Sequence, residues 1–147
     1  MLGSFLKTDQ DFAVFVARIV LGFVMLPHGL QKLLGMFGGS GFTGTVDFFV
    51  GSGIPYFVAV LIILGESLGA VGLILGFLSR LCVLGITIIM LGAIFMVHLP
   101  NGFFMNWFGS SAGEGYEYHI LAVGLALVVL IKGGGMWSVD GAISKEI

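Results

Sequence analysis

Long apolar runs alternate with short polar or glycine-rich segments along this chain, and the runs predict membrane-spanning helices. The runs occupy residues 12–34, 55–77, 81–99 and 118–131. A helix needs ~20 apolar residues to cross a hydrocarbon core of ~30 Å, so each run except the last is long enough to cross alone. Helix is expected throughout, because lipid-exposed strands or loops would leave backbone groups without hydrogen bonds.

The glycine-rich segment between the first two runs contains a further helical stretch over residues 43–50, which predicts a short interfacial helix. The expected fold is therefore all-α, an integral membrane four-helix bundle forming one domain over residues 1–147. In the second run Gly65, Gly69, Gly72 and Gly76 lie on one helix face. Small residues on one face allow close helix approach. The approaching helix belongs either to the same bundle or to a second copy, so a homo-oligomer stays open.

Composition supports the membrane assignment and excludes several classes of protein. The chain is 58% hydrophobic and 10% charged, with a mean hydropathy of +1.13. Soluble domains carry about 25% charged residues. The net charge of −2 and the absence of a basic run argue against nucleic acid as a partner. Cys82 is the single cysteine, so one chain cannot form an internal disulfide, an iron–sulfur cluster or a cysteine zinc cage.

The distribution of Lys and Arg outside the spans predicts the orientation of the chain. Cytoplasmic loops of membrane proteins carry an excess of these residues. With the N-terminus in the cytoplasm, the cytoplasmic side holds Lys7, Arg80, Lys132 and Lys145, and the outer side holds Lys32. We therefore expect a multi-pass protein of the cell (inner) membrane with both termini in the cytoplasm. Both long aromatic, glycine-rich loops would then face outward.

Two charged residues lie away from the ends of the first two spans. A charge near the centre of a span costs at least ~2.5–3.5 kcal/mol by insertion scales, so it needs a partner. Glu66 lies near the middle of the second span and Arg18 lies on the polar face of the first. Counted from the cytoplasmic ends, their depths differ by less than ~10 Å, within reach of an Arg side chain. The sequence predicts that Arg18 and Glu66 form a structural ion pair or a proton relay.

The remaining polar residues of the spans cluster at the predicted outer end, which makes that end the candidate ligand site. They are His28, Lys32, His98, Glu117 and His119, and together with Glu66 they form the predicted ligand-binding set. A largely apolar pocket with a few convergent polar groups is the usual form of a small-molecule site, and imidazole or ammonium groups can donate to carbonyl oxygens. Metal or haem binding is less favoured because no HxxxH or ExxH spacing is present, so no metal is expected. The alternative is that these side chains extend into the interface and tie the loops together.

Short motifs run through nearly the whole chain. They are Arg18, His28-Gly29-Leu30-Gln31-Lys32-Leu33, Glu66, Gly76-x-x-x-Arg80, Gly102-Phe103-Phe104, Glu117-Tyr118 and Gly133-x-Gly135-x-x-Ser138-x-Asp140. In this order and spacing they resemble the DoxX family of small bacterial membrane proteins. The resemblance implies a four-helix membrane protein related to the DoxD-type subunit of thiosulfate:quinone oxidoreductase, and for some members an association with a membrane redox complex. It supplies no catalytic residues.

Taken together, these features predict a membrane subunit of a quinone-linked redox system that binds a quinone-like lipophilic molecule near the outer face. His28 and Lys32 would hydrogen-bond its head group, and Phe103, Phe104 and Trp107 would line the entrance. No intrinsic cofactor is expected, so a redox partner protein would supply the electrons; membrane lipid is the other expected partner. Whether the chain is itself an enzyme stays open. The alternatives are a non-enzymatic scaffold that binds a partner protein or lipid, and a small transporter.

Overall fold

The computed structural model describes residues 6–145, and its regular elements from residue 12 onward are all helical, as the sequence predicts. They are α2 (Phe12–Leu34), η1 (Met36–Gly38), α3 (Gly41–Gly51), α4 (Tyr56–Leu75), α5 (Ser79–Ala93), η2 (Ile94–His98), η3 (Leu99–Asn101), α6 (Glu117–Lys132) and α7 (Val139–Ile143). The short helix expected between the first two spans is α3, which is a few residues longer at its start than predicted.

Within the described residues, three helical segments are long and apolar enough to cross a membrane. They are Phe12–Leu34, Tyr56–Leu75, and Ser79–Asn101, in which η2 and η3 continue α5. The fourth helix, α6, has 16 residues and falls short of that length. At 1.5 Å per residue it measures about 24 Å, against a hydrocarbon core of about 30 Å. That α6 crosses the membrane remains a prediction.

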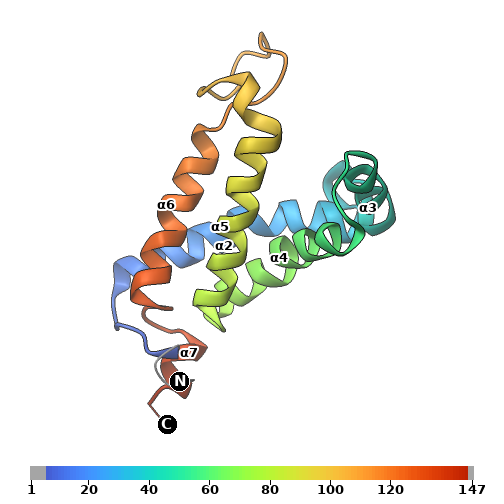
Figure 1. Ribbon diagram of the computed structural model, residues 1–147. Coiled ribbons are helices and arrows are strands. Elements are labelled where there is room, and N and C mark those ends of the chain that lie inside the picture. Colours follow the sequence, from blue (N-terminus) through green and yellow to red (C-terminus); the bar gives the residue numbers. More distant parts are fainter. Residues whose placement is uncertain (1–5, 146–147) are drawn as a thin grey trace.

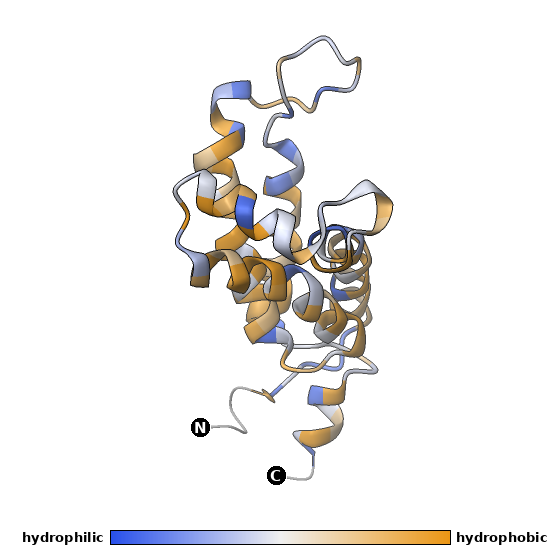
Figure 2. Cartoon of the chain, turned by 90° about the vertical axis from the view of Figure 1, so that its right-hand side faces the viewer, coloured by the Kyte–Doolittle hydropathy of each residue, from blue (hydrophilic) through white to orange (hydrophobic). Residues whose placement is uncertain are grey.

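The surface of the helices is strongly apolar. Phe23, Leu61, Ile88 and Ile131 are each more than half exposed, on α2, α4, α5 and α6 in turn. Figure 2 shows that apolar residues dominate the helices and that polar residues are few along them. Soluble monomers rarely expose large contiguous apolar patches. The outward side chains of these helices are therefore suited to lipid.

The helices pair as two hairpins, α2 with α4 and α5 with α6. Figure 1 shows the α2/α4 pair running across the α5/α6 pair, with α3 and the loop of residues 102–116 at separate ends of the molecule. The two glycine-rich aromatic loops, expected together at one outer face, therefore lie apart. The shared core contains Leu21 and Met25 from α2, Leu73 from α4, Ile86 from α5 and Val129 from α6.

The closest approach of α2 and α4 depends on glycines of the first helix. A Cβ on Gly29 would lie 2.5 Å from the Glu66 carbonyl oxygen and from Ser67 Cα. The predicted stripe on α4 has a different role: a Cβ on Gly65 would meet a side chain of α5, and Gly69 has no atom of the described residues within 4 Å of its Cβ position. Close packing thus occurs at Gly29, which places residues 28–32 of α2 beside Glu66.

Hydrogen bonds fasten the helices together at the end of the molecule that contains α7. The Asp140 carboxylate accepts from the backbone N–H of Leu78 (2.7 Å) and of Ser79 (2.8 Å), the first residue of α5. Lys132 Nζ donates to Asp9 Oδ2 (3.0 Å), and this hydrogen bond lowers the pKa of the Asp9 carboxyl. We call this region the α7 end. Its contacts fix where the spanning helices begin and end.

Candidate functional site

Glu66 pairs with a lysine of α2. Lys32 Nζ lies 2.6 Å from Glu66 Oε2, and the Glu66 side chain is 6% exposed while that of Lys32 is 24% exposed. A buried carboxylate needs a partner with a full charge or several hydrogen bonds. The close approach at Gly29 supplies that partner, because Lys32 lies almost one turn beyond Gly29 on α2. The pair lies at the end of α2 that leads into α3.

The predicted ion pair between Arg18 and Glu66 is wrong. Arg18 is fully buried, and its guanidinium donates instead to backbone carbonyls at the α7 end. The acceptors are the carbonyl oxygens of Gly134 (2.6 Å), Ile74 (2.9 Å), Met136 (3.2 Å) and Leu73.

Two features explain why Arg18 does not pair with Glu66: the unpaired carbonyls at the end of α4, and the register of α2 against α4. The last carbonyls of a helix lack partners within it, and the guanidinium fork of Arg18 satisfies those at the end of α4. Ile74 lies eight residues beyond Glu66, which is about 12 Å along α4. Estimating depth from the helix ends could not detect this offset, because it is set by which residues of α2 and α4 touch.

The three histidines lie along a line of neighbouring rings that includes one tyrosine. The ring centroids of His98 and His119 are 4.2 Å apart, those of His119 and Tyr118 are 5.2 Å apart, and those of Tyr118 and His28 are 6.2 Å apart. His98 Nδ1 donates to the carbonyl of Glu114 (2.8 Å). His119 is buried, and its Nδ1 has no hydrogen-bond partner among the described residues. The line therefore joins α2 to α6 and to η2.

Glu117 lies at the start of α6 but serves the neighbouring loop. Its Oε1 accepts from the backbone N–H of Met105 (2.9 Å) and from the indole N–H of Trp107 (3.0 Å). The carboxylate is thus engaged with residues 102–116 and lies outside both grooves described below. Phe103, Phe104 and Trp107, expected to line the entrance to the site, also line neither groove.

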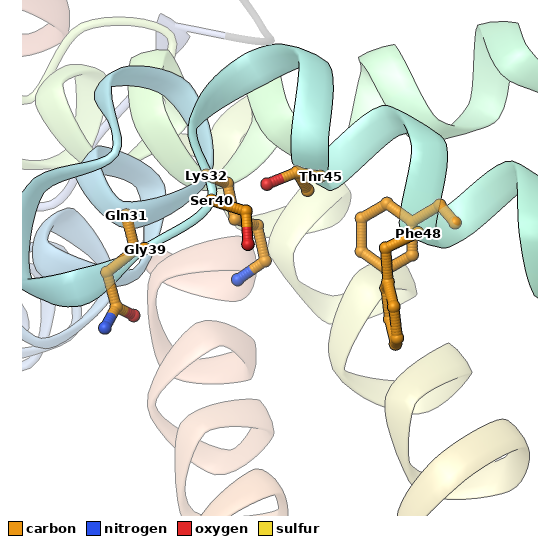
Figure 3. A pocket seen from close by; sticks show the side chains of 7 residues that line it. Gln31, Lys32, Gly39, Ser40, Thr45 and Phe48 are labelled. Carbon is orange, nitrogen blue, oxygen red and sulfur yellow. The ribbon is translucent and has the colours of Figure 1, made fainter.

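A groove of about 290 Å³ opens between the end of α2 and α3, and Figure 3 shows Lys32, Ser40 and Thr45 to one side of Phe48, with the Gln31 amide turned away from them. Its walls consist of Gln31, Lys32, Gly39, Ser40, Thr45, Phe48 and Phe49. We call it the α2–α3 groove. A Cβ on Gly39 would collide with the backbone of Gln31, so this glycine is what lets the chain return so close to α2. The groove combines an ammonium, an amide and two hydroxyls with two phenyl rings.

A second, smaller groove of about 160 Å³ lies between α2 and α6. It is lined by Leu21, Val24, Tyr118, Leu121, Ala122 and Leu125. Apart from the Tyr118 hydroxyl, which donates to Met25 Sδ (3.6 Å), these side chains carry no polar group. We call it the α2–α6 groove. It offers apolar surface without the convergent polar groups that orient a ligand.

Comparison with known proteins identifies the family. The DoxX family model matches residues 13–99, more than half of the chain. The chain belongs to the DoxX family. It is 27% identical over 146 residues to the Escherichia coli (strain K12) protein named "Inner membrane protein YqjF", which covers 96% of this chain and 99% of the relative. These matches and the apolar helices together make this chain a membrane protein of the DoxX family.

A second relative matches part of this DoxX chain. It is the Bacillus subtilis (strain 168) protein named "Putative oxidoreductase CatD", 30% identical over 96 residues, which are 65% of this chain and 67% of the relative. No solved structure matches the chain.

The family match and the structure divide the predicted site residues of the DoxX chain in different ways. The matched segment includes His28, Lys32, Glu66 and His98 and ends before Glu117 and His119. The structure joins Lys32 with Glu66 and places His28, His98 and His119 on the line of rings. The predicted cluster is therefore divided into a charged part near α3 and a ring part near α6.

Sequence reasoning missed three polar residues of the α2–α3 groove in this DoxX protein: Gln31, Ser40 and Thr45. One feature of the sequence could have indicated these residues. Gln31 directly precedes Lys32, and Ser40 follows the glycines that turn the chain back after α2. A tight return of this kind places the residues after the turn beside those before it. How closely the chain returns to α2 is set by the contact of Gly39 with the Gln31 backbone. This distance could not be derived from the sequence spacing alone.

Proposed function

We propose that this DoxX protein binds the head group of a quinone-like lipophilic molecule in the α2–α3 groove, as a membrane subunit of a quinone-linked redox system. Its location would be the cell (inner) membrane, with both termini in the cytoplasm. The observation that carries the proposal is a single groove lined by the Lys32 ammonium, the hydroxyls of Ser40 and Thr45, and two phenyl rings. The name of the Bacillus subtilis relative, "Putative oxidoreductase CatD", supports the redox part.

The chemistry of the groove fits a quinone head group. Quinone carbonyl oxygens accept hydrogen bonds, which the hydroxyls of Ser40 and Thr45 and the ammonium of Lys32 can donate. Lys32 has three N–H donors and gives one to Glu66, so it keeps donors for a ligand. Phe48 provides an apolar wall for the ring. Since His28 lies against Tyr118, its predicted head-group role passes to the groove residues.

Glu66 gives the site a group that can exchange protons. Reduction of a quinone to a quinol takes up two protons for two electrons, and the carboxylate of Glu66 lies one hydrogen bond from Lys32. In the proposed system a redox partner protein delivers the electrons. The chain binds and orients the head group, and the Lys32–Glu66 pair supplies a proton donor next to it. The line of histidine rings lies outside this groove and has no part in the proposed step.

The test is a calorimetric titration, in which a short-tailed benzoquinone is added to the purified protein in detergent and the heat of binding is measured. The informative variant combines Ser40→Ala with Thr45→Val, which removes both hydroxyls with little change in shape. A hydrogen bond contributes about 0.5–1.5 kcal/mol, so we expect about a tenfold loss of affinity. The matched control combines Ser110→Ala in the loop with Thr87→Val, whose hydroxyl has no partner among the described residues. Equal affinity of wild type and the groove variant would overturn the site.

A scaffold that holds a partner protein or lipid is the second candidate, and one observation favours it. Arg18 and Glu117 both direct their charged groups to backbone and side-chain partners within the chain, as expected where polar groups serve assembly alone. Purification in mild detergent separates the two functions. Mass spectrometry that finds a co-purifying quinone supports the binding site, whereas a stable partner protein without any extractable quinone supports the scaffold.

A further inference from the structure

The loop of residues 102–116, between η3 and α6, carries an aromatic surface that the proposed quinone site does not use. Phe104 is 74% exposed, Trp107 is 77% exposed and Phe108 is 95% exposed. The loop stands at the far end of the α5/α6 hairpin from the α7 end (Figure 1). We propose that this loop is inserted into one leaflet of the bilayer, where these three side chains contact lipid. This inference is independent of the quinone proposal.

The charged and amide side chains of the loop have hydrogen-bond partners within the loop. Glu114 is the one charged residue between positions 102 and 116, and its Oε2 accepts from the backbone N–H of Asn106 (2.7 Å). The Asn106 side chain in turn accepts from Ser111 N–H (2.9 Å) and donates to the Ser111 carbonyl (3.0 Å). The Glu114 carboxylate and the Asn106 amide are therefore hydrogen-bonded within the loop, although Glu114 itself is exposed, and the three aromatic rings stand outside these contacts.

The backbone at the base of the loop, where it joins α6, has hydrogen-bond partners within the protein. Without water, each peptide N–H and C=O needs a partner within the protein. The N–H groups of Tyr116 (3.1 Å) and Glu117 (2.9 Å) donate to the carbonyl of Phe103, and that of Met105 donates to the Glu117 carboxylate. Gly115 makes the first of these contacts possible, because a Cβ there would lie 2.7 Å from the Phe103 oxygen.

The length of α6 indicates why the loop would enter the bilayer. Its 16 residues measure about 24 Å, about 6 Å less than the hydrocarbon core. If α6 crosses, the residues that precede it must fill the remaining depth. The aromatic residues next to it are of the type enriched at the boundary between head groups and acyl chains.

Continuity with the helix surface favours lipid over a protein as the occupant. In η2, the segment before the loop, Phe95 is 68% exposed, Met96 is 63% exposed and Val97 is 59% exposed. A protein-docking surface carries a polar rim around its apolar centre. Here the aromatic surface continues into the apolar surface of the spanning helix, and the nearest carboxylates, those of Glu114 and Glu117, accept hydrogen bonds from within the protein.

The chain provides its own reporter, because it has two tryptophans, Trp107 in the loop and Trp137 at the α7 end. Wild type and the variants Trp137→Phe and Trp107→Phe are reconstituted into phosphatidylcholine vesicles, with or without bromine on the acyl chains near the head groups. In Trp137→Phe we expect brominated lipid to remove most of the emission, and iodide present on both sides of the vesicle to remove little.

The outcomes separate the occupants. Strong quenching by iodide together with weak quenching by brominated lipid would place Trp107 in water and overturn the proposal. If iodide quenching is then lost when a partner protein is added, the aromatic surface would be assigned to that partner. If Trp137→Phe does not fold, the difference in emission between wild type and Trp107→Phe gives the Trp107 signal in its place. Trp107→Phe keeps an aromatic ring and changes only the indole hydrogen bond to Glu117.

Discussion

Arg18 and Lys32 are two cations of one helix whose acceptors differ in kind. Arg18, fully buried, donates its guanidinium hydrogens to backbone carbonyls, and Lys32 donates to the carboxylate of Glu66. A planar guanidinium can serve several carbonyls at once, whereas an ammonium acts as a compact charge. The residue type at each position thus matches its acceptor. Their sequence spacing shows that both are in the first span, and only the register of α2 on α4 shows which one reaches Glu66.

A double-mutant cycle tests this pairing at the scale of the residue. Lys32→Met leaves the buried carboxylate of Glu66 without its cation and is expected to destabilise the protein, and adding Glu66→Gln should restore part of the loss. Residues in contact show coupling energies of about 0.5–3 kcal/mol. The measurement is unfolding in detergent, compared among wild type, the two single variants and the double variant.

The second cycle, Arg18→Met with Glu66→Gln, is the control. The two side chains share no partner, so their effects should add within about 0.5 kcal/mol. Strong coupling in the Arg18 cycle and additivity in the Lys32 cycle would contradict the arrangement described above and support the ion pair first expected from the sequence.

Among the elements, α2 and α4 are held in register by glycine contacts on one side and by hydrogen bonds at the α7 end. Gly29 brings the backbones together at Glu66, and Arg18 fastens the end of α4. These two contacts fix the position of α2 relative to α4. Since α3 and the α2–α3 groove follow directly from the end of α2, the same register determines where Lys32 meets the groove.

Substitution of glycines tests this packing. Gly29→Ala would place a methyl group 2.5 Å from backbone atoms of α4, which cannot move away as a side chain can, so the helices must separate. Overpacking of this kind costs about 1–3 kcal/mol. Gly69→Ala is the matched control on α4, because its Cβ position has no described atom within 4 Å and Ala gains about 0.5–1 kcal/mol over Gly within a helix.

The measurement is the midpoint of thermal unfolding in detergent, which should fall for Gly29→Ala and stay the same or rise for Gly69→Ala. A fall of similar size in both variants would indicate that the stripe on α4 is itself a close-packed surface, as the sequence first suggested. Such a surface would then face a second copy of the chain.

Periodicity predicted the helical elements well, because apolar runs of this length have a single stable conformation in lipid. It did not predict the π turn η2 (Ile94–His98), since a π turn leaves no signal in an apolar sequence. This turn changes the face on which His98 lies and brings its ring to His119. Of the predicted site residues, Lys32 lines the α2–α3 groove and Glu66 pairs with it, while the pairings that depend on register and local helix geometry were not predicted.

In the whole molecule, the crossing of the two hairpins separates two surfaces that the sequence placed together. The α2–α3 groove lies at the end of one hairpin and the aromatic loop of residues 102–116 lies at the end of the other (Figure 1). Both hairpins share one core and are fastened at the α7 end, where Asp140 accepts from the first residue of α5. A ligand in the groove and lipid around the loop can therefore be bound without competing for the same surface.

The topology of the chain gives the remaining prediction, and it depends on whether α6 crosses. The bias of Lys and Arg predicts both termini in the cytoplasm, which requires an even number of crossings and hence α6 as a fourth span. A fluorescent protein fused after Ile147 should then be bright, and an alkaline phosphatase at the same position should be inactive. The same reporters fused after truncation at Gly109, before α6, should give the opposite signals, because the chain then ends beyond its third crossing.

Equal signals at the two positions would show that α6 does not cross, and the predicted orientation would be wrong. Three of the helical segments are long enough to cross by themselves, so this outcome would leave the C-terminus on the side opposite to the N-terminus. In that case α6 would not complete a span, and the aromatic loop would no longer be needed to extend it. Fusion reporters and the depth of Trp107 therefore test two separate consequences of the same 16-residue helix.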